Sequence, residues 1–345
     1  MRAVVLPASR HTERSRVITA WPTSLCVVVH QVAVISGGLS HERDVSVRSG
    51  RRLAEQLVKA GLDVDHWDVD ERFVGLLSTR DADVAFVALH GGSGENGTVQ
   101  ALLELAGLPF VGSSAGACRG AYDKAIAKTR MVEAGLATPR WVTLPSTIFR
   151  EVGPENLYHL VDSVIGLPLV VKPVAGGSAL GVSVVHEESE LPAALVQAFS
   201  YAPEVLLEAW VDGLEVAVPV VDLGEGPRAL PPVLIEVPEG TTYDYQARYD
   251  ASSNVRYTSL RDDDARMDVP AVREVAVRVH QLLGLRDLSR VDVVVGRDGV
   301  PQVLEAAVTP GLTETSSFPL AVTEAGLDLA QVYATLVANA KKRGG

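Results

Sequence analysis

The sequence predicts an N-terminal α/β domain with a parallel sheet, followed by a region of mixed α+β structure. Between residues 32 and 106, short apolar runs alternate with amphipathic helical patterns, which is typical of parallel sheets. Beyond residue 165, β-type runs follow one another more closely and helices become fewer. That second pattern is typical of α+β structure.

The N-terminal elements can be assigned in order. Residues 32–36 predict a buried strand that ends at Gly37-Gly38, and an amphipathic helix follows over about 42–60. Residues 63–70 and 84–89 predict further strands, with a helix over 98–106 after the second. Ligands in parallel sheets bind beyond the carboxyl ends of the strands. Gly37-Gly38 and the His90-Gly91-Gly92 turn both fall at that edge.

The second region begins with a predicted helix over 114–134. Strands are expected at 169–172, 181–185, 205–209, 216–221 and 230–236. Residues 239–264 form a polar stretch with several tyrosines, and a loop of this length is usually a functional lid or disordered. A helix over 270–283, a hairpin and a terminal helix over 327–342 complete the chain.

The hairpin carries the most informative pair of side chains. Asp292 lies in the run RVDVVV and Glu305 in the run QVLEAA, and the turn-like GRDGVP joins them. Hairpin pairing would bring the two carboxylates side by side. Carboxylate oxygens are hard ligands that suit Mg²⁺, which is usually shared with substrate phosphates.

A second signal is the segment VVKPVAGGSALGVSVV. A β-type run delivers Lys172, and the Gly176-Gly177-Ser178 loop could wrap phosphate oxygens with backbone N–H groups. An ordinary glycine-containing hairpin with an exposed lysine would give the same pattern. The spacing of a Walker A loop is absent. Lys124, in AYDKAIAK, would by itself be a surface lysine on a helix.

Other candidate residues also have ordinary structural explanations. Glu208 and Glu215 could accept hydrogen bonds from an adenine and a ribose, or could be solvated carboxylates at a strand edge. Glu42 could serve as a simple cap in the first helical turn. His90 could belong to loop structure. It lacks two cysteine or histidine partners for zinc, and no GxSxG motif supports a hydrolase.

Composition excludes several classes of partner. The chain has 345 residues, 47% of them hydrophobic, with a formal net charge of −12 and a pI of about 5.2. This charge argues against nucleic acid and anionic membranes as partners, and no run is long enough for a transmembrane helix. Cys26 and Cys118 form no disulfide framework, which fits a reducing cytoplasm. Residues 1–30 are Arg-rich and predict a poorly ordered extension, with a targeting segment as the alternative.

The ordered motifs together resemble the D-alanine–D-alanine ligases of the ATP-grasp superfamily. The resemblance runs from about residue 32 to 340 and is carried by GGLSHERDVSVRSG, ALHGGSGENGTVQALLELAGLPFVGS, YDKAIAK, LVVKPVAGGSALGVS, EAWVDGLEVAV, YDYQARY, RVDVVV and LEAAVTPGLTETSSFP. It implies a Rossmann-like N-terminal α/β domain over 31–120 and two α+β subdomains over 121–203 and 204–345. Those subdomains would form an ATP-grasp fold with a substrate lid around 239–264.

The resemblance also implies a reaction. ATP phosphorylates the carboxylate of one D-alanine, and the amine of a second D-alanine attacks the acyl phosphate, giving a dipeptide for peptidoglycan precursors. Catalysis would then rest on positioning and charge stabilisation. The positions implied for ATP are Lys124, Lys172, Glu208, Glu215 and Arg248. Asp292 and Glu305 would hold Mg²⁺, or Mn²⁺ in its place.

The same resemblance assigns the amino-acid sites. Glu42 would pair with the first ammonium group, and Ser178 and Tyr249 would complete that hydrogen-bonded set. Arg290 and the Gly311 N–H would stabilise the oxyanion. His90 and Ser317 are the implied substrate-binding positions. Ser316 is implied as a catalytic residue, and the two serines would meet the second carboxylate. By the same resemblance, Tyr249 occupies the position at which related depsipeptide ligases have a histidine. A tyrosine there favours an amine as the acceptor.

The sequence departs from the family pattern at several positions. Ala307 replaces an Asn that ligates a second Mg²⁺, and even outer-shell metal partners are worth roughly 10–100-fold. Gly176, Ala179 and Asn96 replace an acidic residue, a serine and an aspartate. Arg248 replaces a lysine, which keeps the charge and changes the donor geometry.

Two alternatives stay open: an amino-acid ligase with other substrates and a catalytically impaired nucleotide-binding homologue. We expect a cytoplasmic homodimer, the commonest state of soluble enzymes.

Overall fold

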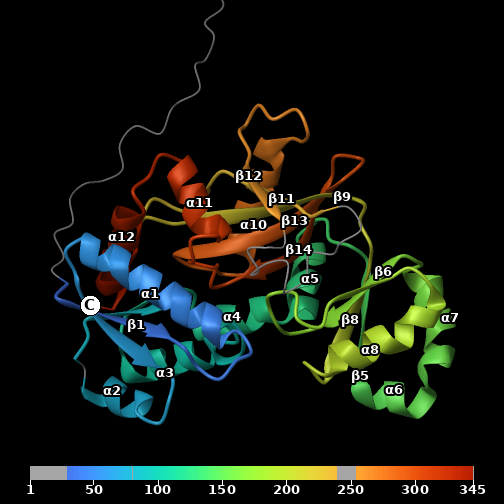
Figure 1. Cartoon of the computed structure of the whole chain (residues 1–345), viewed down its shortest axis with the longest axis horizontal. Helices are drawn as coiled ribbons and strands as arrows, with labels where there is room; N and C mark the ends of the chain where they lie inside the picture. Colours follow the sequence, from blue (N-terminus) through green and yellow to red (C-terminus); the bar gives the residue numbers. More distant parts are fainter. Residues whose placement is uncertain (1–28, 80, 239–253, 345) are drawn as a thin grey trace, which may run out of the picture.

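Three sheets organise the residues that the computed structural model describes, which are 29–79, 81–238 and 254–344 (Figure 1). The predicted extension lies almost entirely outside these ranges. Within them, no helix combines the length and the apolar character needed to cross a membrane. The N-terminal sheet is parallel and the other two are antiparallel, as the sequence predicts.

The N-terminal sheet has the order β2-β1-β3-β4 and is covered by helices from both ends of the chain. The C-terminal helix α12 packs against β3, β4 and α1, and Tyr333 is fully buried among Val34 and Phe86. The bounds are β1 Gln31–Ser36, α1 Arg43–Lys59, β2 Asp63–Asp68, α2 Phe73–Thr79, β3 Val84–Val87, α3 Thr98–Ala106, β4 Phe110–Val111 and α12 Leu329–Arg343.

The central sheet has the order β5-β8-β6-β7, and α8 packs on it through Leu191, Leu195 and Ala198. Strand β8 pairs with both β5 and β6, so this sheet continues past the predicted boundary at residue 203. The bounds are β5 Trp141–Pro145, α6 Ser146–Val152, α7 Pro154–Val164, β6 Leu169–Pro173, β7 Ser183–Val185, α8 Leu191–Phe199 and β8 Glu204–Ala209.

The third sheet has the order β12-β11-β9-β13-β14, with β10 paired to β9. Helix α10 packs across it and buries Val272, Ala276 and Val279 against Val218 and Val291. Strand β12 lies inside the stretch predicted as a loop, over 239–264, so this prediction is wrong for residues 256–259. The bounds are β9 Gly213–Val221, β10 Arg228–Ala229, β11 Val233–Glu236, β12 Arg256–Ser259, α10 Val269–Leu282, β13 Leu288–Gly296, β14 Pro301–Ala307 and α11 Ser317–Glu324.

The helix predicted over 114–134 is two helices, α4 Ala115–Tyr122 and α5 Lys124–Glu133. Asp123 between them is extended (φ −82°, ψ 105°), and its side chain accepts a hydrogen bond from the N–H of Ile126 at 3.0 Å. Its backbone bridges to Ala175, beside the glycine loop. The break therefore places Lys124 at the start of α5, directly against that loop.

Candidate active site

The β13–β14 hairpin sets Asp292 directly opposite Glu305, which is the predicted register. The register shifts between Asp292 and Val293, because the next paired residue on β14 is Val303. Leu304 is thus the extra residue of a β-bulge, a feature that re-aims neighbouring side chains. Asp292 is buried and Glu305 is half-buried.

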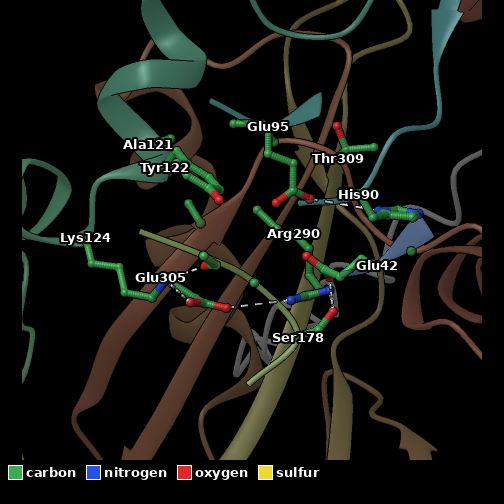
Figure 2. A pocket seen from close by; sticks show the side chains of 16 residues that line it. Glu42, His90, Glu95, Ala121, Tyr122, Lys124, Ser178, Arg290, Glu305 and Thr309 are labelled. Carbon is green, nitrogen blue, oxygen red and sulfur yellow. Dashed lines mark hydrogen bonds and ion pairs between the residues drawn. The ribbon is translucent and has the colours of Figure 1, made fainter. Parts of the chain in front are cut away.

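Two cations neutralise this carboxylate pair. The Arg290 guanidinium donates two hydrogen bonds to Asp292, at 2.7 and 2.8 Å, and lies 3.9 Å from Glu305. The Lys124 ammonium lies 3.1 Å from Glu305, as Figure 2 shows. Two adjacent carboxylates fit a hard divalent cation such as Mg²⁺. In the ranges described, no His, Cys, Asp or Glu adds a third ligand, so phosphate oxygens and water would complete the coordination.

A cavity beside the hairpin carries predicted residues from several segments on its wall, among them Glu42, His90, Ser178 and Gly311. We call it the acidic cavity; it is also lined by Glu95, Tyr122, Lys124, Gly176, Gly177, Arg290, Glu305, Ala307 and Thr309. These residues come from the start of α1, the turn after β3, the junction of α4 and α5, the β6–β7 loop, and the hairpin with the loop that follows it (Figure 2). The cavity therefore lies where all three sheets meet.

Glu42 is 4% exposed and is held from two sides. The Ser178 hydroxyl donates a hydrogen bond to its carboxylate. On the other side, Gly91 (φ +68°) lies so close that a Cβ there would be 2.2 Å from Glu42 Oε2. Only glycine accommodates both this φ and this approach. The carboxylate is thus fixed in place, facing the cavity.

His90 connects the acidic cavity to the loop after β14. Its Nε2 lies 2.8 Å from the Ser49 hydroxyl, which accepts a hydrogen bond from the Leu312 N–H at 3.5 Å. Its Nδ1 lies 3.9 Å from Glu95. The side chain is almost fully buried. This chain of contacts fixes the backbone next to Gly311.

Two further lining residues were not predicted. Glu95 is 8% exposed, and Tyr122 accepts a hydrogen bond from the Gly92 N–H at 3.2 Å. Burial, helped by the charge of Glu95, raises the pKa of Tyr122 to about 12, so its hydroxyl is neutral at pH 7. Glu95 follows a glycine turn at the expected binding edge of the sheet, and this position was a usable signal.

A second cavity, mainly apolar, lies between the central and third sheets. We call it the apolar cavity; its walls include Val170, Val184, Trp210, Val211, Val294 and Leu304, and it also contains Lys172, Glu208, Glu215 and Asp292. It shares Lys124, Gly176, Gly177 and Glu305 with the acidic cavity. Apolar walls with a few placed charged groups are typical of ligand sites.

A buried ion cluster lies at the wall of the apolar cavity. Glu208 pairs with Lys172 through one carboxylate oxygen and with Lys128, at 2.8 Å, through the other. Burial works to raise the pKa of Glu208, yet the two lysines hold it below its ordinary value. Burial lowers the pKa of Lys128 to about 8. Lys128 was not predicted, although it stands four residues after Lys124 on one helix face.

The remaining predicted residues are not on these walls. Ser316 and Ser317 line neither cavity; Ser316 lies 2.8 Å from the Thr313 hydroxyl and accepts from its N–H at 3.2 Å. Ser316 still neighbours Gly311, where a Cβ would lie 2.5 Å from its hydroxyl. Arg248 and Tyr249 fall outside the described residues.

A Rossmann-like sheet followed by two antiparallel sheets that enclose a charged cavity defines a protein of the ATP-grasp class. The sequence matches the D-ala D-ala ligase N-terminus family over residues 71–113 and the D-ala D-ala ligase C-terminus family over 131–338. The chain therefore belongs to the D-alanine–D-alanine ligase family.

Individual relatives agree with this assignment. A D-alanine–D-alanine ligase of Anaeromyxobacter sp. (strain K) is 38% identical over 86% of this chain and 92% of its own length. The crystal structure of the Bacillus anthracis ligase has a TM-score of 0.77 at 29% identity, covering 92% of this chain and all of that one. The same ligase complexed with ATP has a TM-score of 0.74 at 27% identity, covering 91% and 98%. The resemblance seen in the motifs is confirmed.

Proposed function

We propose that the chain is an ATP- and Mg²⁺-dependent ligase that joins two D-alanines into D-alanyl-D-alanine for peptidoglycan precursors. The γ-phosphoryl group of ATP passes to a carboxylate oxygen of the first D-alanine, and ADP leaves. The amine of the second D-alanine then attacks the acyl carbon. Phosphate leaves with the former carboxylate oxygen, and the attacking nitrogen loses its proton.

The observation that carries this proposal is the junction of the two cavities. The apolar cavity suits an adenine, the acidic cavity suits amino-acid ammonium groups, and Lys124, Gly176, Gly177 and Glu305 belong to both. A phosphoryl donor in one and a carboxylate acceptor in the other would meet at this shared wall. Such positioning supplies much of the rate of a phosphoryl transfer.

The nucleotide half uses charged groups around the apolar walls. Glu208 and Glu215 accept hydrogen bonds from the adenine and the ribose, while Lys124 and Lys172 hold phosphate oxygens, together with Arg248. Asp292 and Glu305 would hold the metal ion. Magnesium bound there would neutralise charge on the phosphates.

The amino-acid half uses the acidic cavity. Glu42, kept in place by Ser178 and Gly91, takes the first ammonium group, and a buried carboxylate does so with a strong charge-assisted hydrogen bond. Tyr249 closes this set. His90 supports the substrate site through its contacts with Ser49 and Glu95.

The transition state needs stabilisation of an oxyanion. Arg290, whose guanidinium already faces the carboxylate pair, and the Gly311 N–H supply it. Ser316 and Ser317, at the start of α11 beside Gly311, bind the second carboxylate. To bind this carboxylate, the Ser316 hydroxyl gives up its hydrogen bond with the Thr313 hydroxyl.

Three wider features belong to the same proposal. The chain works in the cytoplasm, where its substrates arise, and as a homodimer. Its units are the N-terminal α/β domain and the two ATP-grasp subdomains. Because β8 pairs within the central sheet, we place the second boundary after residue 209.

The test is ADP release by the purified chain with ATP, Mg²⁺ and a panel of single amino acids, with mass detection of products. We expect ADP and D-alanyl-D-alanine with D-alanine and neither with L-alanine. A better turnover of another amino-acid pair would replace D-alanine as the substrate. ATP binding without ADP release on any amino acid would mean that the chain is not a ligase.

A further inference from the structure

Lys128 is the most deeply buried charged side chain near the nucleotide pocket, and the proposed reaction does not use it. Its side chain is fully inaccessible to solvent, and it lines neither cavity. Its ammonium lies 2.8 Å from Glu208 Oε2 and donates a hydrogen bond of 2.5 Å to the Thr138 hydroxyl. A buried lysine without a function costs stability, because burial penalises the ammonium form.

The charges of the ion cluster explain what Lys128 does. Lys172 alone with Glu208 would be a neutral pair, since the two groups are in direct contact within a buried site. The second lysine brings the cluster to a net charge of +1. Lys172 and Glu208 line the apolar cavity, whereas Lys128 lies behind them. The excess positive charge therefore faces the cavity through Lys172.

From this arrangement, and on the basis of the proposed function, we infer that Lys128 is a positioning residue for the nucleotide phosphates. Its ammonium neutralises the Glu208 carboxylate from the side away from the apolar cavity. The Lys172 ammonium can then pair with phosphate oxygens. Lys128 itself touches no ligand. Its effect should grow with the number of phosphates and should be absent for an adenine nucleoside.

A second set of contacts ties Lys128 to the metal-binding hairpin. Thr138, which accepts from Lys128, donates its own hydroxyl to the Val303 carbonyl at 2.7 Å, and the Val303 N–H donates to the Ala137 carbonyl at 2.9 Å. Val303 lies next to the bulge residue Leu304, two positions before Glu305. One partly buried network of hydrogen bonds and ion pairs thus connects the Lys172 site with the strand that carries a proposed metal ligand.

The test uses binding of adenosine and of ADP, each measured by calorimetry with chelator present so that no divalent cation contributes. The readout is the ratio of the adenosine and ADP dissociation constants, because contacts to the adenine cancel in it. We expect Lys128→Met to lower this ratio by at least roughly tenfold, the value of a charge-assisted hydrogen bond. Lys59→Met, at a lysine 65% exposed, serves as the matched control and should leave the ratio unchanged.

The double variant Lys128→Met/Glu208→Gln separates charge from structure. With the carboxylate removed, Lys172 no longer needs a second partner, so the ratio should recover most of the loss. Two results would overturn the inference. One is a ratio in Lys128→Met equal to that of the wild type, and the other is a ratio in the double variant as low as in Lys128→Met.

If Lys128→Met does not fold, Glu208→Gln alone decides. The inference predicts that the ratio of adenosine to ADP dissociation constants in Glu208→Gln is at least that of the wild type. A lower ratio in this variant contradicts the inference. A wild-type chain that binds ADP no better than adenosine would overturn the phosphate site itself, and with it the proposed function. The two failures are therefore distinguishable.

Discussion

Glu42 depends on Gly91, a residue far from it in the sequence. Gly91 combines a φ of +68° with a backbone that approaches the Glu42 carboxylate, whereas its neighbour Gly92 (φ +46°) meets nothing closer than Ser40 Cβ at 3.6 Å. Both glycines therefore have a positive φ, but only Gly91 lies against the Glu42 carboxylate. They offer a matched pair for testing whether the placement of this carboxylate matters.

We predict that Gly91→Ala raises KM for one of the two D-alanine sites by roughly tenfold or more, because the new methyl displaces Glu42 from the ammonium. Gly92→Ala should share the loss in melting temperature caused by the positive φ and keep KM close to wild type. Steady-state kinetics at saturating ATP measure both. Equal KM values in the two variants would contradict the role of Glu42 in binding the ammonium group.

Lys128 also predicts a pH dependence of nucleotide binding. Burial depresses its pKa to about 8, so its charge is present below pH 8 and lost as pH rises through that value. The charged groups acting on it are Glu208, which raises its pKa, and Lys172 and Lys124, which lower it. The adenosine-to-ADP ratio should therefore fall by roughly tenfold between pH 7 and pH 9.5.

This fall should be missing in Lys128→Met, which has no such proton to lose. Tyr122 and Cys118, whose pKa values are raised to about 12 by burial, stay protonated across this window. A ratio that is flat in the wild type, or falls equally in the variant, would contradict the assignment to Lys128.

At the scale of elements, the β13–β14 hairpin shows how well a local pattern can specify a site. The pairing of Asp292 with Glu305 follows from two apolar runs and a tight turn, and all of this information is local. Ala307 lies two residues after Glu305 and lines the acidic cavity on the same face of the strand. An oxygen ligand at this position would point toward the metal.

We predict that Ala307→Asn tightens Mn²⁺ binding in the presence of ADP by roughly tenfold or more. Paramagnetic resonance of free Mn²⁺ measures this without turnover. Ala307→Leu, which adds bulk and no ligand oxygen, is the control. An unchanged affinity in Ala307→Asn would indicate that water already completes the coordination.

The break between α4 and α5 shows what a local pattern misses. The run from 114 to 134 has a continuous helical periodicity, so one helix was the natural prediction. What divides it is distant in sequence: Asp123 bridges to Ala175, and the Lys124 N–H donates to the Val174 carbonyl at 3.0 Å. Lys128 was missed for the same reason, because its partner Glu208 lies on β8, far from α5 in the sequence.

At the scale of the whole molecule, a buried aspartate connects both ends of the chain to the third sheet. Asp287 precedes β13 and accepts hydrogen bonds from Arg343 at 2.7 and 2.6 Å and from the Gly112 N–H, after β4, at 2.8 Å. Burial raises the pKa of Asp287, while Arg343 acts to lower it. One carboxylate thus links the N-terminal sheet, α12 and the third sheet.

We predict that Arg343→Ala lowers the free energy of unfolding by about 2–3 kcal/mol, a value discounted because Arg343 is one-third exposed. Urea denaturation measures it. Arg297→Ala removes an equally short pair with Asp212, 83% and 64% exposed, and should cost roughly 0.5 kcal/mol or less. Similar losses of unfolding free energy in both variants would mean that the Arg343–Asp287 pair stabilises the fold no more than an exposed ion pair does.

The overall arrangement was predictable from the sequence because alternation and strand pairing are local. The parallel sheet, the antiparallel sheets and the Asp292–Glu305 hairpin follow from such patterns. The position of α12 on the first sheet depends on packing between distant segments. The sequence therefore predicts the sheets and the hairpin better than it predicts which distant segments touch.

The most direct measurement follows oxygen from D-alanine labelled with ¹⁸O in its carboxylate. The wild-type chain with ATP and Mg²⁺ should release phosphate that carries one ¹⁸O for each D-alanyl-D-alanine formed, because the carboxylate oxygen leaves with the phosphoryl group. Mass spectrometry reads both products from one reaction. Dipeptide with unlabelled phosphate would contradict the acyl phosphate, and phosphate without dipeptide would contradict the ligase.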